Sequence, residues 1–416
     1  MRRELKFVKD KKRLALLFIL VAVFTLWQGT SLFALDELDK GIVAQDNNKF
    51  AFDLYSQVKQ KEGNLFLSPF SISTALAMTY AGARGNTETQ MADTLYFSLS
   101  QERLHPAFLT LMQGLRADSA RSGYELSIAN ALWGQGGYKF HGAFIDITKN
   151  YYEAGFKEVD FVKNTEAARQ TINQWIEAKT KDKIKELIKP GVLTEFTRLV
   201  LTNAIYFKGK WISQFKKEST KPEPFELISG DKVQVSMMNQ TKEFNYSENE
   251  NIQILEMPYD GNKLSMVILL PKEKKGIREL ENLLKAENLK TWLSTLRKRE
   301  VIVSLPKFKM TSEFLLNEAL KALGMTDAFD RTSADFTGMT PDPVGLYISE
   351  VIHKAFVDVN EEGTEAAAAT AVDMTLKAAM MLESKPVFRA DHPFVFIIRD
   401  KSSDSILFIG RVMDPR

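Results

Sequence analysis

One stretch near the C-terminus is compatible with more than one backbone conformation, and this ambiguity constrains the fold more than any other feature. Residues 361–382 read EEGTEAAAATAVDMTLKAAMML, and a strand-like segment, YISEVIHKAFVDVN, precedes them. Alanine is the best helix former, and apolar side chains recur every four residues, which favours a helix. They stand at Ala368, Val372, Leu376 and Met380.

The same stretch also alternates with a period of two, as an inner strand does. No proline or glycine occurs between Thr364 and Lys385, and either would weaken a strand at the centre of a sheet. One face would carry Thr364, Ala366, Ala368, Thr370, Val372, Met374 and Leu376. Because the segment can be a loop, a helix or a strand, we interpret it as a candidate conformational switch.

The body of the 416-residue chain reads as one soluble globular domain. It is 44% hydrophobic and 26% charged, and no proline- or serine-rich tract, charge run or repeat divides it. The net charge of +2 gives no reason to expect nucleic acid or an anionic membrane as a partner. The absence of cysteine excludes disulfides, thiol catalysis and cysteine metal sites. We therefore expect a single domain over residues 36–416.

The first 35 residues differ from this body. Residues 1–13 carry seven basic side chains, residues 14–34 carry no charge, and acidic residues follow. A basic, then apolar, then acidic order is typical of an export signal. If it is not cleaved, the apolar stretch is just long enough to span a bilayer. We expect a secreted or extracytoplasmic protein, extracellular or periplasmic, with an amino-terminal membrane anchor as the alternative.

Periodicity predicts an α+β fold of about nine helices, with strands concentrated in the second half. Residues 64–73 read as a short strand that runs into a helix, where Ser68 and Ser71 can cap orphan amides. Residues 199–211 form a nearly continuous apolar run, typical of a strand covered on both faces. Asn203 lies inside that run, so we expect it to be a satisfied hydrogen-bonding node.

No enzyme template is present. The nucleophile elbow, the zinc-protease helix, the phosphate loop and the dinucleotide fingerprint are all missing from the sequence. The four histidines include no pair at metal-ligand spacing. His353 lies in an alternating strand and is best explained as a core histidine that holds a hydrogen bond. We expect no catalytic residue, no metal ion and no cofactor.

Two motifs around the ambiguous stretch resemble a known family. Residues 361–371, EEGTEAAAATA, are similar to the hinge of an inhibitory serpin's reactive-centre loop, and FRADHPF at 388–394 resembles the signature that follows that loop. NAIYFKGKW at 203–211 and LPKF at 305–308 resemble the third and sixth strands of the family's sheet A. The resemblance covers residues 45–416. It implies the serpin fold, with three β-sheets, a large central sheet A and an exposed reactive-centre loop at about residues 361–387.

The resemblance also implies two polar clusters that control the opening of sheet A. The breach, at the top of the sheet, would contain Trp211 and an ion pair between Lys307 and Glu361. The shutter would contain Ser68, Ser71, Asn203 and His353. The loop hinge would comprise Glu361, Glu362, Gly363, Thr364, Glu365, Ala366, Ala367, Ala368, Ala369 and Thr370.

The implied function is suicide inhibition of a serine protease, with cysteine proteases as a further class of target. The protease attacks the exposed loop, forms an acyl-enzyme, and is trapped when the cut loop inserts into sheet A. Counting fifteen residues from the hinge glycine places the bond at Lys377–Ala378, which predicts a trypsin-like target. The loop is a residue or two longer than in many members, so a cut after Leu376 or Met380 stays open and would indicate chymotrypsin- or elastase-like proteases. We expect a monomer that binds its protease covalently.

A rival within the same family is a non-inhibitory serpin that acts as a carrier, chaperone or storage protein. Such members often have bulky, charged or proline residues in the hinge, whereas this hinge reads Thr-Glu-Ala-Ala-Ala-Ala-Thr-Ala. We therefore favour the inhibitor. A conventional hydrolase is disfavoured because no motif supports it.

Overall fold

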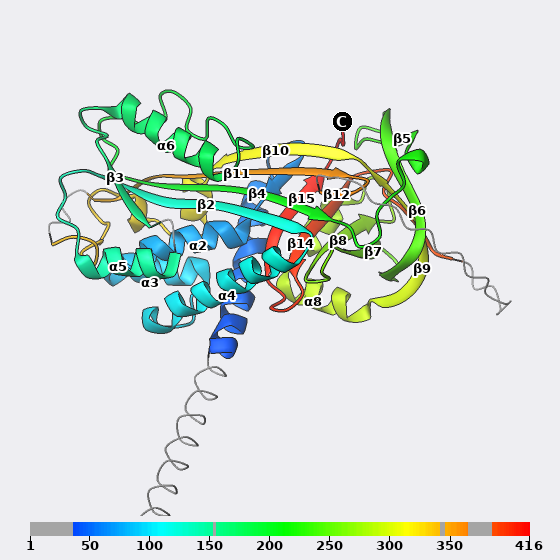
Figure 1. Cartoon of the computed structure of the whole chain (residues 1–416), viewed down its shortest axis with the longest axis horizontal. Helices are drawn as coiled ribbons and strands as arrows, with labels where there is room; N and C mark the ends of the chain where they lie inside the picture. The colour runs from blue at the N-terminus through cyan, green and yellow to red at the C-terminus, as the bar shows by residue number, and fades with distance from the viewer. Residues whose placement is uncertain (1–35, 153–154, 342–345, 365–384) are drawn as a thin grey trace, which may run out of the picture.

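Two sheets and their covering helices form the body of the protein (Figure 1). The structure is a computed structural model that describes residues 36–152, 155–341, 346–364 and 385–416. Helices within these ranges are residues 36–58, α2 (Pro69–Tyr80), α3 (Gly85–Leu95), α4 (Gln101–Arg121), α5 (Gly142–Tyr152), α6 (Thr165–Lys179), α7 (Ile277–Leu283), α8 (Ala286–Thr295) and α9 (Asn317–Ala322). Short 3₁₀ turns lie at η1 (Lys217–Ser219) and η2 (Asp327–Phe329).

The six-stranded sheet holds the start of the ambiguous stretch. Its order is β10 (Phe308–Leu315), β11 (Ile348–Asn360), β12 (Gly363–Thr364), β4 (Leu199–Lys210), β2 (Tyr124–Gln135) and β3 (Phe156–Val159). Helix α6 lies on one face of this sheet, and α2 and α4 lie on the other (Figure 1). Coverage on both faces explains why the strand predicted over residues 199–211 is almost entirely apolar.

The nine-stranded sheet packs against the first. Its order is β1 (Leu65–Leu67), β15 (Ile406–Val412), β14 (Phe394–Asp400), β8 (Leu264–Pro271), β7 (Ile252–Pro258), β6 (Lys232–Glu248), β9 (Arg297–Pro306) and β13 (Val387–Arg389), with β5 (Lys221–Glu226) beside β6. The α+β serpin fold is confirmed, but the described residues form two sheets instead of three. Strand β6 is 17 residues long and pairs with β5, β9 and β7 in succession, so it joins what would otherwise be two separate sheets.

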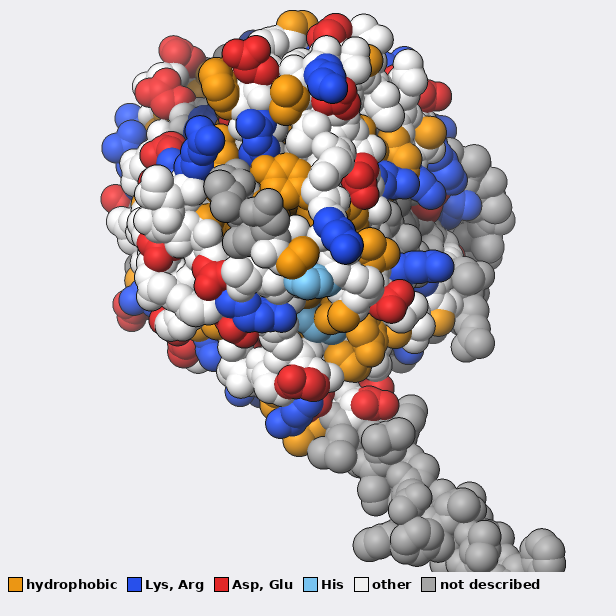
Figure 2. Space-filling view, turned by 90° about the vertical axis from the view of Figure 1, so that its left-hand side faces the viewer, with side chains coloured by type: hydrophobic (Ala, Val, Ile, Leu, Met, Phe, Trp, Pro, Cys, Tyr) orange, Lys and Arg blue, Asp and Glu red, His pale blue; other side chains and the backbone are white. Residues whose placement is uncertain are grey.

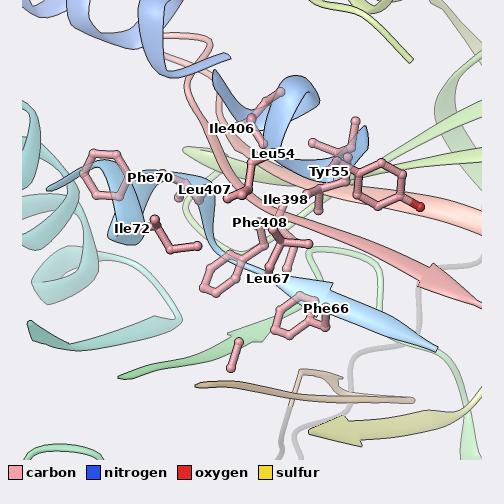
Figure 3. Close-up of a cluster of buried hydrophobic side chains, with 14 of the residues drawn as sticks. Leu54, Tyr55, Phe66, Leu67, Phe70, Ile72, Ile398, Ile406, Leu407 and Phe408 are labelled. Carbon is pink, nitrogen blue, oxygen red and sulfur yellow. The ribbon is translucent and has the colours of Figure 1, made fainter. Parts of the chain in front are cut away.

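The main core lies where the amino-terminal helix, α2 and the nine-stranded sheet meet (Figure 3). All twelve residues of α2 are buried, which fits its lack of any charged side chain. Pro69 stands in its first turn, and the Ser68 hydroxyl accepts a hydrogen bond from the Ser71 amide, as predicted for a cap. The labelled side chains, none more than 1% exposed, are Leu54, Tyr55, Phe66, Leu67, Phe70, Ile72, Ile398, Ile406, Leu407 and Phe408.

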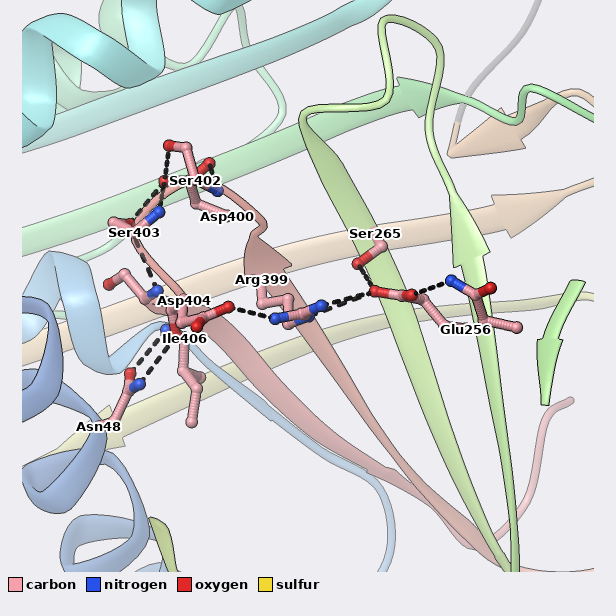
Figure 4. A network of polar contacts seen from close by, with 11 residues as sticks. Asn48, Glu256, Ser265, Arg399, Asp400, Ser402, Ser403, Asp404 and Ile406 are labelled. Carbon is pink, nitrogen blue, oxygen red and sulfur yellow. Dashed lines mark hydrogen bonds and ion pairs between the residues drawn. The ribbon is translucent and has the colours of Figure 1, made fainter. Parts of the chain in front are cut away.

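A buried ion pair and its hydrogen bonds connect four strands of the nine-stranded sheet, β6, β7, β8 and β14 (Figure 4). The Glu256 carboxylate on β7 accepts hydrogen bonds from Arg399 at 2.9 Å, Ser265 at 2.8 Å and Asn245 at 2.8 Å. Burial alone would raise the pKa of Glu256, but the Arg399 charge and these hydrogen bonds outweigh it and lower the pKa. The charge is therefore buried with its partners, which is the condition for tolerating it.

None of the helices in the described ranges combines the length and the apolar character needed to cross a bilayer. The predicted export signal or anchor at residues 1–35 lies outside those ranges.

Candidate functional site

The ambiguous stretch begins inside the six-stranded sheet. After β11 the chain turns at Glu361 and Glu362, and β12 enters between β11 and β4, antiparallel to both. Gly363 pairs with Asn360 on one side and with Lys210 on the other. Beyond these two residues, β11 and β4 pair directly with each other in parallel. The sheet is therefore open at one end only, and the hinge residues Gly363 and Thr364 occupy the opening.

Only glycine fits at position 363. Its φ is +145°, and a Cβ atom built there would lie 2.0 Å from the carbonyl oxygen of Gly209. An L side chain rarely adopts that φ, and backbone atoms on β4 cannot move aside as the end of a flexible side chain can. The hinge glycine predicted from the motif is thus required by close packing against β4.

The segment after β4 holds the backbone of this turn. The Trp211 amide donates to the Glu362 carbonyl at 2.9 Å, and the Phe215 amide donates to the Glu361 carbonyl at 2.8 Å. The Trp211 indole NH donates to the Asn360 carbonyl at 3.1 Å, while its ring stacks on Tyr259. Trp211, which we predicted to belong to the breach, therefore holds this turn by direct hydrogen bonds from its backbone amide and its indole NH.

The carboxylates of Glu361 and Glu362 are buried and face lysines. Glu361 accepts from Lys307 at 2.9 Å, as predicted, and from the Thr220 hydroxyl at 2.8 Å. Burial would raise the pKa of Glu361, but the hydrogen bonds from Lys307 and Thr220 lower it overall. Glu362 pairs with Lys217 at 2.9 Å, and this contact raises the pKa of Lys217. The second carboxylate oxygen of Glu362 is buried with no hydrogen-bond partner among the described residues.

The four predicted shutter residues meet at the centre of the six-stranded sheet. The Ser68 hydroxyl donates to the Leu407 carbonyl at 2.6 Å, and the Ser68 amide donates to His353 Nε2 at 3.1 Å. Asn203 Nδ2 donates to the Ser71 hydroxyl at 2.6 Å. All four side chains are at most 1% exposed, so the cluster is sealed from solvent.

A bond between His353 and Asn203 links β11 to β4 across the closed part of the sheet. The two residues are register partners in the parallel pair, and His353 Nδ1 hydrogen-bonds Asn203 Oδ1. Because Nε2 accepts from the Ser68 amide, the Nδ1 atom must carry the proton of a neutral ring. Complete burial lowers the pKa of His353 to about 3, which keeps the ring neutral. This bond must break before another strand can enter at that level.

Three participants were not predicted from the sequence. Asn130 on β2 accepts from Ser71 at 3.0 Å and from Asn203 at 2.5 Å, which completes the shutter. The sequence could have identified Asn130, because an asparagine within the apolar strand LSIANAL needs hydrogen-bond partners just as Asn203 does. The contacts of Thr220 and Lys217 with the hinge carried no sequence signal, because both residues lie in an exposed turn about 140 positions away.

The rest of the predicted loop lies outside the described residues. This applies to the hinge residues Glu365, Ala366, Ala367, Ala368, Ala369 and Thr370, and to the proposed bond between Lys377 and Ala378. Within the described ranges, no three histidine, aspartate or glutamate side chains are placed to hold a metal ion.

Residues 45–415 match the family described as serpin, serine protease inhibitor. This chain belongs to the serpin family. It is therefore a protease inhibitor and not an enzyme. It is 45% identical over 381 residues to the human leukocyte elastase inhibitor, covering 89% of this chain and 98% of that protein. It is 42% identical to an uncharacterised serpin-like protein of Methanosarcina acetivorans, covering 91% and 88%.

Solved serpin structures superpose closely on this serpin. Uncleaved ovalbumin is 30% identical with a TM-score of 0.80, covering 90% of this chain and all of that one. The thermophilic serpin tengpin in its native state is 32% identical with a TM-score of 0.81, covering 89% and 94%. The hinge, breach and shutter residues named above thus lie in a shared architecture.

Proposed function

We propose that this serpin is a suicide inhibitor of serine proteases that is cut between Lys377 and Ala378. The observation that carries the proposal is β12, which already lies antiparallel between β11 and β4. Each further loop residue that enters would advance one position along both strands. In that register Thr370 would lie between His353 and Asn203, so insertion would replace the bond that closes the sheet.

The same register supports burial of the even-numbered face of the loop. Ala366 would lie between Val357 and Phe207, and Ala368 between Ala355 and Ile205. These strand residues all belong to the buried main core. Small side chains at the leading positions would therefore enter a packed layer without overfilling it.

The length of strand β4 supports the proposed position of the cleaved bond, Lys377–Ala378. Met374 would lie opposite Leu199, which is the first residue of β4, so Lys377 would emerge three positions beyond the end of that strand. The protease becomes attached when its serine oxygen attacks the Lys377 carbonyl carbon. That attack breaks the bond to Ala378, whose amine takes a proton and leaves, and forms an ester between the serine and Lys377. After insertion of the cut loop, a protease attached to Lys377 would lie beyond the end of the sheet.

The test is incubation of residues 36–416 with trypsin, chymotrypsin, elastase and a subtilisin-like protease, followed by denaturing gels and mass spectrometry. We expect an SDS-stable complex with trypsin and a released peptide that begins at Ala378. Elastase is included among the proteases because the name of the human relative refers to it. A complex with a peptide that begins after Leu376 or Met380 would support the same mechanism but place the cleaved bond at that residue instead of at Lys377. Clean cleavage with no complex under any protease would refute inhibition and favour a carrier or storage protein.

We also propose that residues 1–35 direct the chain out of the cytoplasm. The basic, apolar and acidic order of that segment supports the proposal. Intact-mass measurement of the protein recovered from culture medium and from membranes distinguishes a cleaved signal from a retained anchor. Recovery of the full-length chain in the cytosolic fraction alone would contradict both.

A further inference from the structure

We infer that the sheet face at the C-terminal foot of the reactive loop is a second contact surface for the target protease. The surface is a row of three cross-strand neighbours, Thr241 on β6, Ile302 on β9 and Val387 on β13. Because register partners project from the same face, these side chains stand side by side. Ile302 is 38% exposed and Val387 is 52% exposed, although both lie in strands. This inference rests on the proposed function and extends it.

Polar rows lie on both sides of this row, whose apolar members are Ile302 and Val387. On one side Glu243 and Glu300 are paired across the strands, and each is neutralised by a lysine, Lys298 at 2.9 Å and Lys385 at 3.0 Å. On the other side lies Arg389, the register partner of the buried Ser304, and it pairs with Glu223 and with Asp391 at 3.3 Å. An apolar centre with a satisfied polar rim is the usual anatomy of a protein–protein contact. Mixed charges in the rim do not suit a polyanion or an anionic membrane, both of which select one sign of charge.

The position of the row identifies the occupant. Val387 follows Ala378 by nine residues, and a chain of that length spans at most about 32 Å. A protease domain of roughly 220 residues has a radius of gyration of about 17 Å. A protease bound at the proposed bond is thus large enough to cover the row while its active site holds the loop. The backbone of this foot is fixed, because the Ile302 amide donates to the Pro386 carbonyl at 3.0 Å and Gln253 donates to the Val387 carbonyl at 2.9 Å.

At the opposite end of the molecule acidic and basic side chains are interspersed (Figure 2). That end offers a matched control residue. Ile145 on α5 is 37% exposed, almost the same as Ile302, and α5 lies far from β9 in Figure 1.

The test compares Ile302→Thr, Val387→Thr and the double variant with wild type and with Ile145→Thr. Threonine keeps the β-branched shape and strand propensity while it removes apolar contact. The measurement is the second-order rate constant for formation of the SDS-stable complex with trypsin, together with the stoichiometry of inhibition. We expect the double variant to be slower by roughly tenfold, as loss of a small apolar hot spot predicts, with unchanged stoichiometry. The Ile145→Thr control should match wild type.

Several outcomes would overturn the inference. A double variant as fast as wild type, or one slowed no more than Ile145→Thr, would show that the row does not touch the protease. Sedimentation that finds a wild-type dimer and a monomeric double variant would assign the row to self-association. If wild type itself forms no complex, the proposed function fails instead, and the two failures are distinguishable. Thermal unfolding of each variant confirms that it is folded, and Ile302→Val, which keeps the apolar contact, should retain the wild-type rate.

Discussion

At the scale of single residues, Gly363 determines whether the hinge can occupy its slot. A Cβ atom at this position would overlap the carbonyl group of Gly209, and the φ of +145° is strained for any L side chain. We expect Gly363→Ala to expel β12 and delay insertion, so that more loops are cut without trapping the protease. Titration with trypsin should show a severalfold higher stoichiometry of inhibition.

The control for this change is Gly114→Ala. Gly114 has an ordinary φ within α4, and no atom lies within 4 Å of a Cβ built there. Alanine favours a helix more than glycine does, so this variant should inhibit like wild type. Equal stoichiometry for Gly363→Ala and Gly114→Ala would show that the position of the hinge does not affect trapping.

His353 makes the closed sheet sensitive to acid. Burial lowers its pKa to about 3, and burial lowers the pKa of His105 to about 4, whereas an unfolded histidine titrates near 6.5. The folded state therefore binds fewer protons than the unfolded state between these values, so stability is complete above pH 6.5 and falls as the pH drops below it. Between pH 6.5 and 5 each histidine should cost up to roughly 2 kcal/mol of unfolding free energy.

Urea unfolding at pH 7 and pH 5 measures this loss. The variant His353→Gln should lose less stability between the two pH values than wild type. A His353→Gln variant with the full wild-type loss would show that the shutter histidine does not carry the acid sensitivity.

Some residues of the site could be predicted from the sequence, and others could be found only from the fold. Ser68, Ser71, Asn203 and His353 are polar side chains within apolar runs, and such residues must find partners, so local reasoning combined with the family motif identified them. The ion pair between Glu362 and Lys217 joins two residues of types that usually lie on the surface, and they are far apart in the chain. Only the fold brings them together, and no local pattern predicts it.

At the scale of elements, the sequence of residues 361–382 does not decide between two backbone conformations. Periodicity alone fits a helix and a strand equally, since alanine fits both patterns. The neighbouring strand β4 was predictable, because it is a nearly continuous apolar run. The joining of the sheets by β6 was not predictable, since it depends on which strands meet along its 17 residues.

A proline in the entering strand tests the insertion step. In the register set by β12, Ala368 would lie between Ala355 and Ile205 and would need its amide hydrogen for the ladder. Proline has no such hydrogen. We therefore expect Ala368→Pro to be cut at the normal rate but to form no stable complex, so that the inhibitor becomes a substrate.

The matched control is Glu383→Pro, because residue 383 follows the proposed bond in the sequence and would not insert with the cut strand. Denaturing gels of both variants with trypsin should show a complex for Glu383→Pro only. If Ala368→Pro still forms a stable complex, the loop does not insert past position 368 and the proposed mechanism is wrong.

At the scale of the whole molecule, β12 enters between β11 and β4 at one end of the six-stranded sheet, and beyond it these two strands pair directly with each other. Only two residues of β12 occupy a path that runs along the twelve residues of β4. Filling it would add roughly ten ladder positions, each worth about 1 kcal/mol of net stability. Under the proposed mechanism, the connectivity of the uncut chain would keep it from its most stable arrangement, because the loop is joined to β12 at one end and to β13 at the other.

Cutting the loop should consequently stabilise the molecule. A gain on the order of 10 kcal/mol, at about 2 °C of midpoint shift per kcal/mol, raises the unfolding midpoint by on the order of 20 °C. Calorimetry before and after limited cleavage at the loop measures the shift, and cleaved Ala368→Pro should show little of it because its strand cannot enter. A cleaved wild-type chain that melts at the temperature of the intact one would mean that β12 marks the end of insertion and not its beginning.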